Sequence, residues 1–147
     1  MTLEPGLRAA FSYTVTEADT ATAAGSGEVP VLATPRVLAL AEQATVAAVA
    51  GALEAGATTV GTRVELDHLV PSPVGADLEV VARLERIDGR RLQFAVRLRD
   101  GERLVAGGRV TRVVVDKAAF LRRAAAEARP PGERVADGDR AGGGRGG

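Results

Sequence analysis

The chain contains no cysteine, no tryptophan and only one histidine among its 147 residues. The absence of cysteine excludes disulfides, thiol nucleophiles and thiolate metal sites. A lone histidine without cysteine also argues against a zinc site. We therefore predict neither a metal nor a cofactor.

No charge of one sign predominates, because 19 lysines and arginines balance 19 aspartates and glutamates. A neutral chain does not indicate a polyanionic partner, so nucleic acid is not expected to bind. No apolar run reaches the length of a membrane span, and the first residues lack a signal-peptide pattern. We expect a cytoplasmic protein with no membrane partner.

The composition changes near residue 129. A chain of this length with 46% hydrophobic residues can bury one substantial core. Residues 129–147 are rich in glycine, arginine and proline and contain almost nothing to bury. We predict one domain over residues 1–128 and a disordered tail over residues 129–147.

Hydrophobic periodicity predicts five strands, two helices and one long loop. The expected strands cover residues 9–16, 60–70, 77–87, 92–99 and 102–115, the helices residues 34–53 and 117–128, and the loop residues 17–30. Asp88-Gly89 and Asp100-Gly101 are typical of tight turns, so the last three strands should form an antiparallel meander. Gly107-Gly108 indicates a β-bulge in the last strand.

The helix over residues 34–53 is almost wholly apolar or small. Thr34 is a good N-cap, and Pro35 suits the first helical position because its missing N–H would be unpaired there. Apolar residues surround nearly the whole circumference, which predicts an enclosed helix rather than one on a surface. The clearest polar break is Glu42-Gln43.

A long apolar helix followed by an antiparallel sheet predicts an α+β protein in which five strands wrap around one central helix. This arrangement is the hot-dog fold. The only imidazole, His68, lies in the first strand after the helix, and the helix carries one carboxylate, Glu42. Such a pair can perform acid–base chemistry near neutral pH.

Several short motifs, in order, resemble the fluoroacetyl-CoA thioesterase family. They are Val31-Leu32-Ala33-Thr34 with Glu42 eight residues later, Gly61-Thr62 with His68 and a proline-containing loop after it, the Ile87–Leu92 hairpin, and the Gly-Gly strand leading to Arg112. The resemblance extends from about residue 9 to residue 120 and therefore covers most of the expected domain.

The resemblance implies an enzyme that hydrolyses a small acyl-CoA to the free acid and CoA. It implies a catalytic set of Thr34, Glu42 and His68, with Gly61 and Arg112 as substrate-binding residues. The family has an aromatic lid before the helix, whereas residues 25–33 contain no aromatic residue. We expect Val29 and Leu32 to contact the acyl group instead, and we do not expect fluoroacetyl-CoA to be the physiological substrate.

Other interpretations remain open at this point. Thr34 taken alone is a helix cap, and a lone strand histidine is usually structural. A non-enzymatic hot-dog module that binds acyl-CoA is one alternative function. A hot-dog hydratase or dehydratase is less favoured, because Arg63 and not aspartate lies five residues before His68. The sequence does not separate Glu42 as nucleophile from Glu42 as general base, or CoA from a carrier protein.

The first strand after the helix is also expected to form an interface. In hot-dog proteins this strand usually pairs with a second copy, which covers an otherwise exposed sheet edge. The apolar residues Val64, Leu66, Leu69 and Val70 are consistent with this role. We therefore predict a homodimer.

Overall fold

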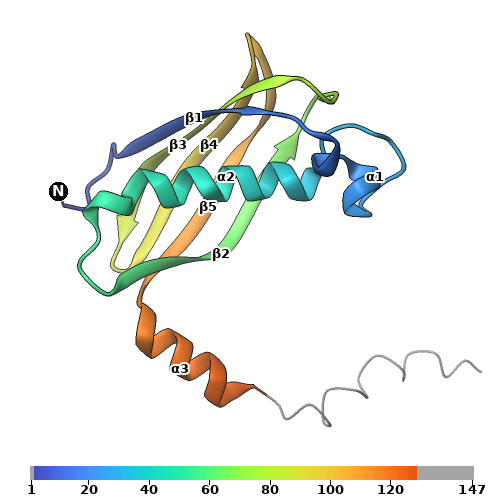
Figure 1. Ribbon diagram of the computed structural model, residues 1–147. Helices are drawn as coiled ribbons and strands as arrows, with labels where there is room; N and C mark the ends of the chain where they lie inside the picture. The colour runs from blue at the N-terminus through green and yellow to red at the C-terminus, as the bar shows by residue number, and fades with distance from the viewer. Residues whose placement is uncertain (1, 129–147) are drawn as a thin grey trace, which may run out of the picture.

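The computed structural model describes residues 2–128, so the predicted disordered tail lies outside the described residues. The elements are β1 (Arg8–Thr14), η1 (Glu17–Asp19), α1 (Ala21–Ala24), α2 (Thr34–Val49), η2 (Ala50–Ala52), β2 (Ala57–His68), β3 (Asp77–Asp88), β4 (Arg91–Asp100), β5 (Arg103–Asp116) and α3 (Lys117–Glu127) (Figure 1). The predicted order of one strand, one central helix and four further strands is confirmed.

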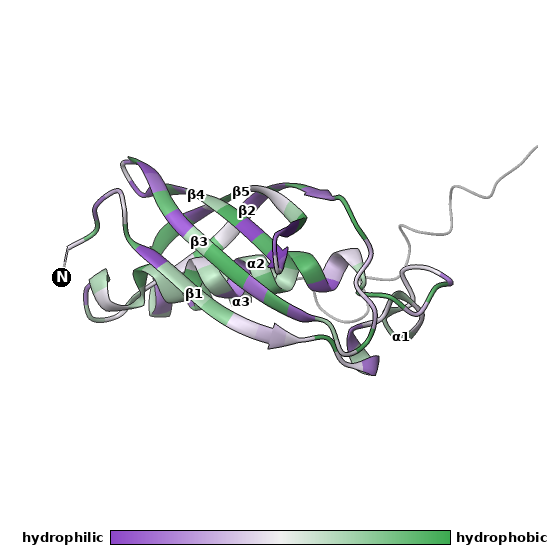
Figure 2. Ribbon diagram, turned by 90° about the horizontal axis from the view of Figure 1, so that it is seen from above, coloured by the Kyte–Doolittle hydropathy of each residue, from purple (hydrophilic) through white to green (hydrophobic). Residues whose placement is uncertain are grey.

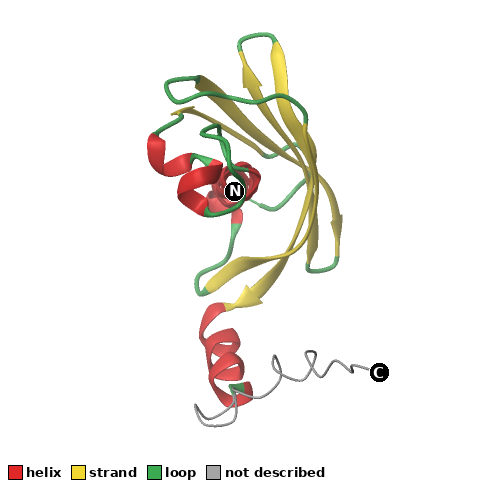
Figure 3. Cartoon of the chain, turned by 90° about the vertical axis from the view of Figure 1, so that its right-hand side faces the viewer, coloured by secondary structure: helices red, strands yellow, loops and turns green. Residues whose placement is uncertain are grey.

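The five strands form one antiparallel sheet in the order β1-β3-β4-β5-β2. The sheet curves around α2, which crosses its concave face (Figures 1 and 3). The predicted hot-dog fold and the β3–β4–β5 meander are confirmed. Gly89 and Gly101 make the two hairpin turns with φ of +60° and +58°, where residues with a Cβ are disfavoured.

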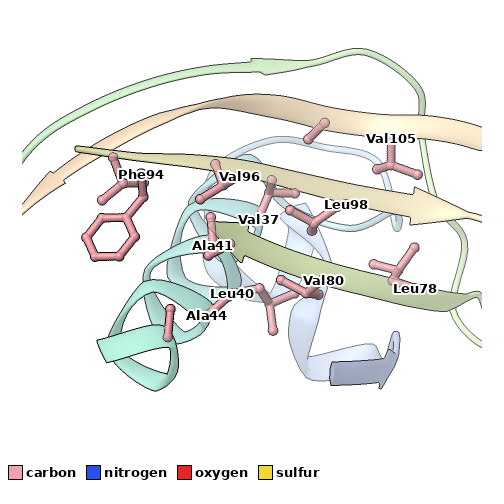
Figure 4. Close-up of a cluster of buried hydrophobic side chains, with 14 of the residues drawn as sticks. Val37, Leu40, Ala41, Ala44, Leu78, Val80, Phe94, Val96, Leu98 and Val105 are labelled. Atoms are coloured by element: carbon pink, nitrogen blue, oxygen red, sulfur yellow. The ribbon is translucent and has the colours of Figure 1, made fainter. Parts of the chain in front are cut away.

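The core lies between α2 and the concave face of the sheet. Hydrophobic and hydrophilic residues alternate along the central strands, so one face of each strand is apolar (Figure 2). In Figure 4, residues of α2 face residues of β3, β4 and β5: Val37, Leu40, Ala41, Ala44, Leu78, Val80, Phe94, Val96, Leu98 and Val105. This contact fixes where each helix residue meets the sheet.

The helix α2 differs from the prediction in two respects. It ends at Val49, and the turn η2 follows where four more helical residues were expected. The helix is also not enclosed by this chain, because the sheet covers only one of its sides. Val46 is 46% exposed, and Ala39, Gln43 and Ala47 on the uncovered side are exposed too.

The segment predicted as a loop over residues 17–30 contains η1 and α1. Local side-chain hydrogen bonds stabilise these short elements. At the start of α1, for example, the Thr20 hydroxyl accepts a hydrogen bond from the Ala23 N–H. None of the described helices is long and apolar enough to cross a membrane.

The bulge predicted at Gly107-Gly108 is wrong, because both residues pair in register with β2 and β4. The β2–β5 register instead shifts between Gly61 and Arg63. Gly108 has a different role: a Cβ there would overlap the backbone carbonyl of Glu65. Glycine at this position therefore permits the close approach of β2 to β5.

Candidate active site

Thr34 and His68 meet at the N-terminal end of α2. Thr34 is the first residue of α2, and His68 is the last residue of β2. The Thr34 hydroxyl and His68 Nδ1 lie 2.8 Å apart, within hydrogen-bond distance. The fold thus brings together two of the predicted catalytic residues, which are 34 positions apart in the sequence.

The predicted N-cap role of Thr34 is wrong. Ala33 occupies the cap position and provides no side-chain cap, and Pro35 follows Thr34 within the first turn. The Thr34 hydroxyl contacts His68, so it does not accept a hydrogen bond from the first backbone N–H groups of α2. Among residues 2–128, no acceptor is found for the backbone N–H of Thr34. The start of α2 therefore presents an N–H and a hydroxyl on one residue.

The environment of His68 favours the neutral imidazole. Burial lowers its pKa below the ordinary value of 6.5, and the backbone of Val70 opposes this only in part. Its Nε2 is buried and has no hydrogen-bond partner among the described residues. Because buried polar atoms normally have a partner, Nε2 is the atom of His68 that can form a further hydrogen bond.

An aliphatic cavity of about 320 Å³ opens beside this pair. The segment before α2 and the turn after β2 provide its walls. Its larger apolar side chains are Val29, Val31, Leu32, Leu69, Val70 and Pro71, and no aromatic residue lines it. Both predicted acyl-contact residues belong to the cavity: Leu32 is buried, whereas Val29 is largely exposed.

Glu42 belongs to a second centre, two turns further along α2. Its Oε2 accepts a hydrogen bond from Arg112 Nη1 at 2.8 Å. Arg112 is only 7% exposed. Its Nε donates to the Thr59 hydroxyl at 2.8 Å, and its Nη2 donates to the Thr59 carbonyl at 2.9 Å. These three hydrogen bonds hold the guanidinium group in one orientation, with its positive charge against the carboxylate.

Gly61 lies directly against the Glu42 carboxylate. A Cβ at this position would overlap Glu42 Oε2 and would lie 3.2 Å from Arg112 Nη1. The glycine therefore makes space for the ion pair, and any larger residue would displace the carboxylate. Gly61 and Arg112, both predicted as substrate-binding residues, thus contact Glu42.

The two centres are separate within one chain. Eight residues of α-helix rise about 12 Å, which separates Glu42 from Thr34 along α2. Among the described residues, the hydrogen-bond partner of the Glu42 carboxylate is Arg112, and that of the His68 ring is Thr34. The structure thus gives a Thr–His pair and a Glu–Arg pair in place of one three-residue cluster.

The sequence interpretation missed Thr59, which positions Arg112. A signal was present, because side chains alternate along a strand and Thr59 precedes Gly61 by two residues. Both residues therefore belong to the face of β2 that meets α2.

A second missed group holds the N-terminal end of α2. The Asp19 carboxylate accepts hydrogen bonds from the Tyr13 hydroxyl at 2.7 Å and from Arg36 Nε at 2.8 Å. The Arg36 guanidinium group lies 5.1 Å from the centre of the Tyr13 ring. The backbone carbonyl of Asp19 accepts from the Ala33 N–H at 2.9 Å. We call Tyr13, Asp19 and Arg36 the Asp19 cluster.

The Asp19 cluster contains a strongly acidic carboxyl group. Burial by itself would raise the pKa of Asp19, but hydrogen bonds from the Thr16 backbone, Tyr13 and Arg36 lower it to about 2. No local sequence motif links these residues, so only the fold reveals the cluster. Within residues 2–128, no group of three His, Asp or Glu side chains lies close enough together to hold a metal ion.

Comparison with known protein sequences finds a family and a relative that carry the same thioesterase name. The sequence model of the fluoroacetyl-CoA-specific thioesterase family matches residues 15–118. The fluoroacetyl-CoA thioesterase of Streptantibioticus cattleyicolor is 35% identical over 85 residues, which cover 58% of this chain and 61% of that protein.

Solved structures agree with this assignment. The structure of the fluoroacetyl-CoA thioesterase FlK has a TM-score of 0.82 and 26% identity, covering 88% of this chain and all of the other. A thioesterase superfamily member from Thermus thermophilus has a TM-score of 0.76 and 30% identity, covering 84% and 93%. The chain therefore belongs to the fluoroacetyl-CoA-specific thioesterase family, a family of acyl-CoA thioester hydrolases.

Proposed function

We propose that the protein hydrolyses a small acyl-CoA thioester to the free acid and CoA, with Thr34, Glu42 and His68 as its catalytic set. The observation that carries this proposal is the 2.8 Å contact between Thr34 and His68 beside an aliphatic cavity. The thioesterase names of its relatives support the reaction class.

Hydrolysis breaks the carbon–sulfur bond, adds the hydroxyl of water to the carbonyl carbon and transfers a proton to the departing sulfur. Glu42 would either take a proton from the water or attack the carbon itself, giving an anhydride that water then opens. When His68 Nδ1 accepts a hydrogen bond from the Thr34 hydroxyl, the proton of the neutral imidazole is on Nε2, which can donate a hydrogen bond to the departing sulfur. The proton that the sulfur takes up comes from the attacking water by way of Glu42. The Thr34 N–H at the start of α2 would stabilise the oxyanion.

The cavity walls favour an aliphatic acyl group. Among the described residues that line it there is no Asp, Glu, Lys or Arg and no Phe, Tyr or Trp, and its larger apolar side chains are valine, leucine and proline. Burying each methylene of an acyl chain there would contribute about 0.8 kcal/mol. We therefore propose that the enzyme prefers a short aliphatic acyl-CoA to fluoroacetyl-CoA.

We propose that Arg112 acts on the substrate through Glu42. Thr59 and Glu42 already occupy its Nε, Nη1 and Nη2 atoms, and the residue is almost wholly buried. Its role is to orient the carboxylate and to balance its charge. Gly61 provides the space in which the carboxylate and the thioester carbonyl would meet.

We propose a homodimer that forms through β2. This strand is at the edge of the sheet, and the uncovered side of α2 next to it carries Val46, Ala39 and Ala47. An unpaired edge and an exposed apolar helix side are both surfaces that a second copy would bury.

Such a dimer would also complete the catalytic set. Within one chain, seven strand residues, or about 23 Å, separate Gly61 from His68. Antiparallel pairing of two β2 strands about their midpoint would place the second copy's His68 opposite Ala57. That position is about 13 Å along the strand from Gly61. This pairing would bring the second copy's His68 nearer to Gly61 than the chain's own His68, so we propose that Glu42 of one copy works with Thr34 and His68 of the other.

Mixing two inactive variants tests the shared site. In a heterodimer of Glu42→Ala and His68→Ala chains, a site shared between copies leaves one site intact. Activity that returns on mixing, measured as thiol release, supports the shared site. If mixing restores nothing, while each variant remains dimeric by light scattering, the site lies within one chain.

Thiol release from a series of short acyl-CoAs is the test of the proposed function. The chain has no cysteine, so a thiol-reactive dye reports only the released CoA. We expect turnover that falls about a hundred-fold or more in His68→Ala. Acyl-CoA binding without turnover in the wild type would instead indicate the non-enzymatic module.

A further inference from the structure

The convex face of the sheet carries a polar cavity of about 500 Å³, on the side opposite α2. Three neighbouring strands line it with side chains that differ in kind from those of the aliphatic cavity. They are Arg63 and Glu65 on β2, Arg91 and Gln93 on β4, and Arg109 and Thr111 on β5, with Thr62 at the β2 register shift. We call this group the arginine cavity.

The strand register explains why these side chains converge. Thr111 pairs with Arg63 of β2 on one side and with Gln93 of β4 on the other. Arg109 lies opposite Glu65 of β2 in the strand register. On β5, Val110 and Arg112 are buried on the α2 side, so Arg109 and Thr111, which alternate with them, face outward.

The charges in this cavity are not balanced. Three arginines face one carboxylate, Glu65, which pairs with Arg63 at 3.2 Å. Within the described part of the chain, no acidic side chain forms a salt bridge with Arg91 or Arg109. Because the whole chain is neutral, this excess of two positive charges is local. Thr62, Thr111 and Gln93 add neutral donors around the guanidinium groups.

We propose that the arginine cavity binds the phosphate groups of a nucleotide. Guanidinium groups present paired N–H donors that match phosphate oxygens. Two arginines without a salt-bridge partner among residues 2–128, together with hydroxyl and amide donors, fit a diphosphate. The cavity volume also lies within the range of small-molecule sites and exceeds what a single phosphate fills. The ligand class is therefore a nucleoside diphosphate.

Two sources would provide this chemistry. One is the nucleotide part of the CoA thioester, an interpretation that rests on the proposed function. The other is a free nucleotide that binds independently of the substrate. The arginine cavity and Glu42 lie on opposite faces of β2, since Gly61 contacts Glu42 and Thr62 lines the cavity. The two sources predict different kinetic effects, because only binding of the CoA nucleotide would make KM for acyl-CoA depend on the arginine cavity.

Calorimetric titration of the full chain with ADP and with adenosine 3′,5′-bisphosphate tests the proposal. We expect binding that weakens about tenfold or more in Arg109→Gln and further in Arg91→Gln/Arg109→Gln. Binding should also weaken at about 1 M salt, where the Debye length is about 3 Å. Arg122→Gln on α3 removes the same charge from an exposed site and should leave the affinity unchanged.

Kinetics separate the two sources. If CoA is the ligand, Arg109→Gln raises KM for acyl-CoA and leaves KM for the matching acyl-pantetheine unchanged. If a free nucleotide is the ligand, both KM values stay as in the wild type while ADP binding is lost. Absence of ADP and bisphosphate binding to the folded wild type, or binding that Arg91→Gln/Arg109→Gln does not affect, would overturn the proposal. Both of these overturning results come from calorimetry and do not depend on thiol release by the wild type, which tests the proposed function separately.

Discussion

The two centres on α2 differ in how firmly they are held. Glu42 accepts one hydrogen bond from the buried Arg112, which donates two more to Thr59, and Gly61 lies directly against the carboxylate. Thr34 and His68 share one hydrogen bond at the opening of a cavity, and His68 Nε2 is unpaired among the described residues. The carboxylate is therefore held in one orientation, whereas the imidazole has one nitrogen with no partner among the described residues, and this is the atom that we propose meets the substrate.

The largest expected effect is at Glu42. Glu42→Gln keeps the size of the side chain but removes the charge, so kcat should fall about a thousand-fold. It also leaves the buried charge of Arg112 unpaired, so the free energy of unfolding should fall by about 3 kcal/mol. Thiol release and urea unfolding measure the two effects.

Glu85→Gln on β3 is the matched control for this prediction, because it makes the same substitution at an exposed position away from α2 and β2. It should change neither kcat nor stability appreciably. If Glu42→Gln keeps most of the wild-type kcat, the assignment of Glu42 to the chemistry is wrong.

At the other centre, replacing Thr34 by valine removes the contact with His68, and kcat should fall about a hundred-fold. Thr34→Ser retains the hydroxyl and should restore most of the rate. Thiol release measures both variants. If Thr34→Val and Thr34→Ser lower kcat by the same factor, the hydroxyl does not contribute to the rate.

The pH profile sharpens the same comparison. Burial lowers the pKa of His68, so the neutral imidazole persists below pH 6.5. The acid limb of kcat/KM should therefore have its midpoint below 6.5. Since unfolding would release the imidazole to its ordinary pKa, His68 should also make the folded state less stable as the pH falls through 6.5. An acid limb above 6.5 would contradict this environment.

Gly61→Ala should have a smaller effect than the loss of the carboxylate itself. The new methyl group displaces the end of the Glu42 side chain, so kcat should fall about tenfold with less than about 2 kcal/mol of stability lost. Gly107→Ala is the control, because its nearest neighbour would lie 3.7 Å from the new Cβ. Gly108→Ala should show the reverse pattern, with stability lost through overlap with the Glu65 backbone.

The smallest effect on catalysis is expected at the Asp19 cluster, which holds α2 near Thr34. Asp19→Asn should lower the free energy of unfolding by about 2 kcal/mol, because Arg36 loses its charged partner. In the wild type this contribution is present above pH 3.8 and is lost as the pH falls toward about 2. Urea unfolding at pH 7 and pH 2 would show a difference between the two proteins at pH 7 only.

Much of the fold was predictable because it depends on local periodicity. Alternating residues gave the strands, and the apolar run after residue 34 gave the central helix. The errors occurred where tertiary contacts compete with local preference. Threonine is a common helix-capping residue, yet the Thr34 hydroxyl lies within hydrogen-bond distance of His68 instead. The Gly107-Gly108 pair suggested a bulge, yet Gly108 instead allows β2 to lie close to β5.

The strands, the central helix and the residue types of the candidate site could be predicted from the sequence alone, because these follow from side-chain periodicity and motif order. The partners of those residues became visible in the folded chain. The fold places Thr34 against His68 and Glu42 against Arg112, residues 34 and 70 positions apart. Such contacts depend on strand order and on where α2 crosses the sheet, and local chain preferences specify neither.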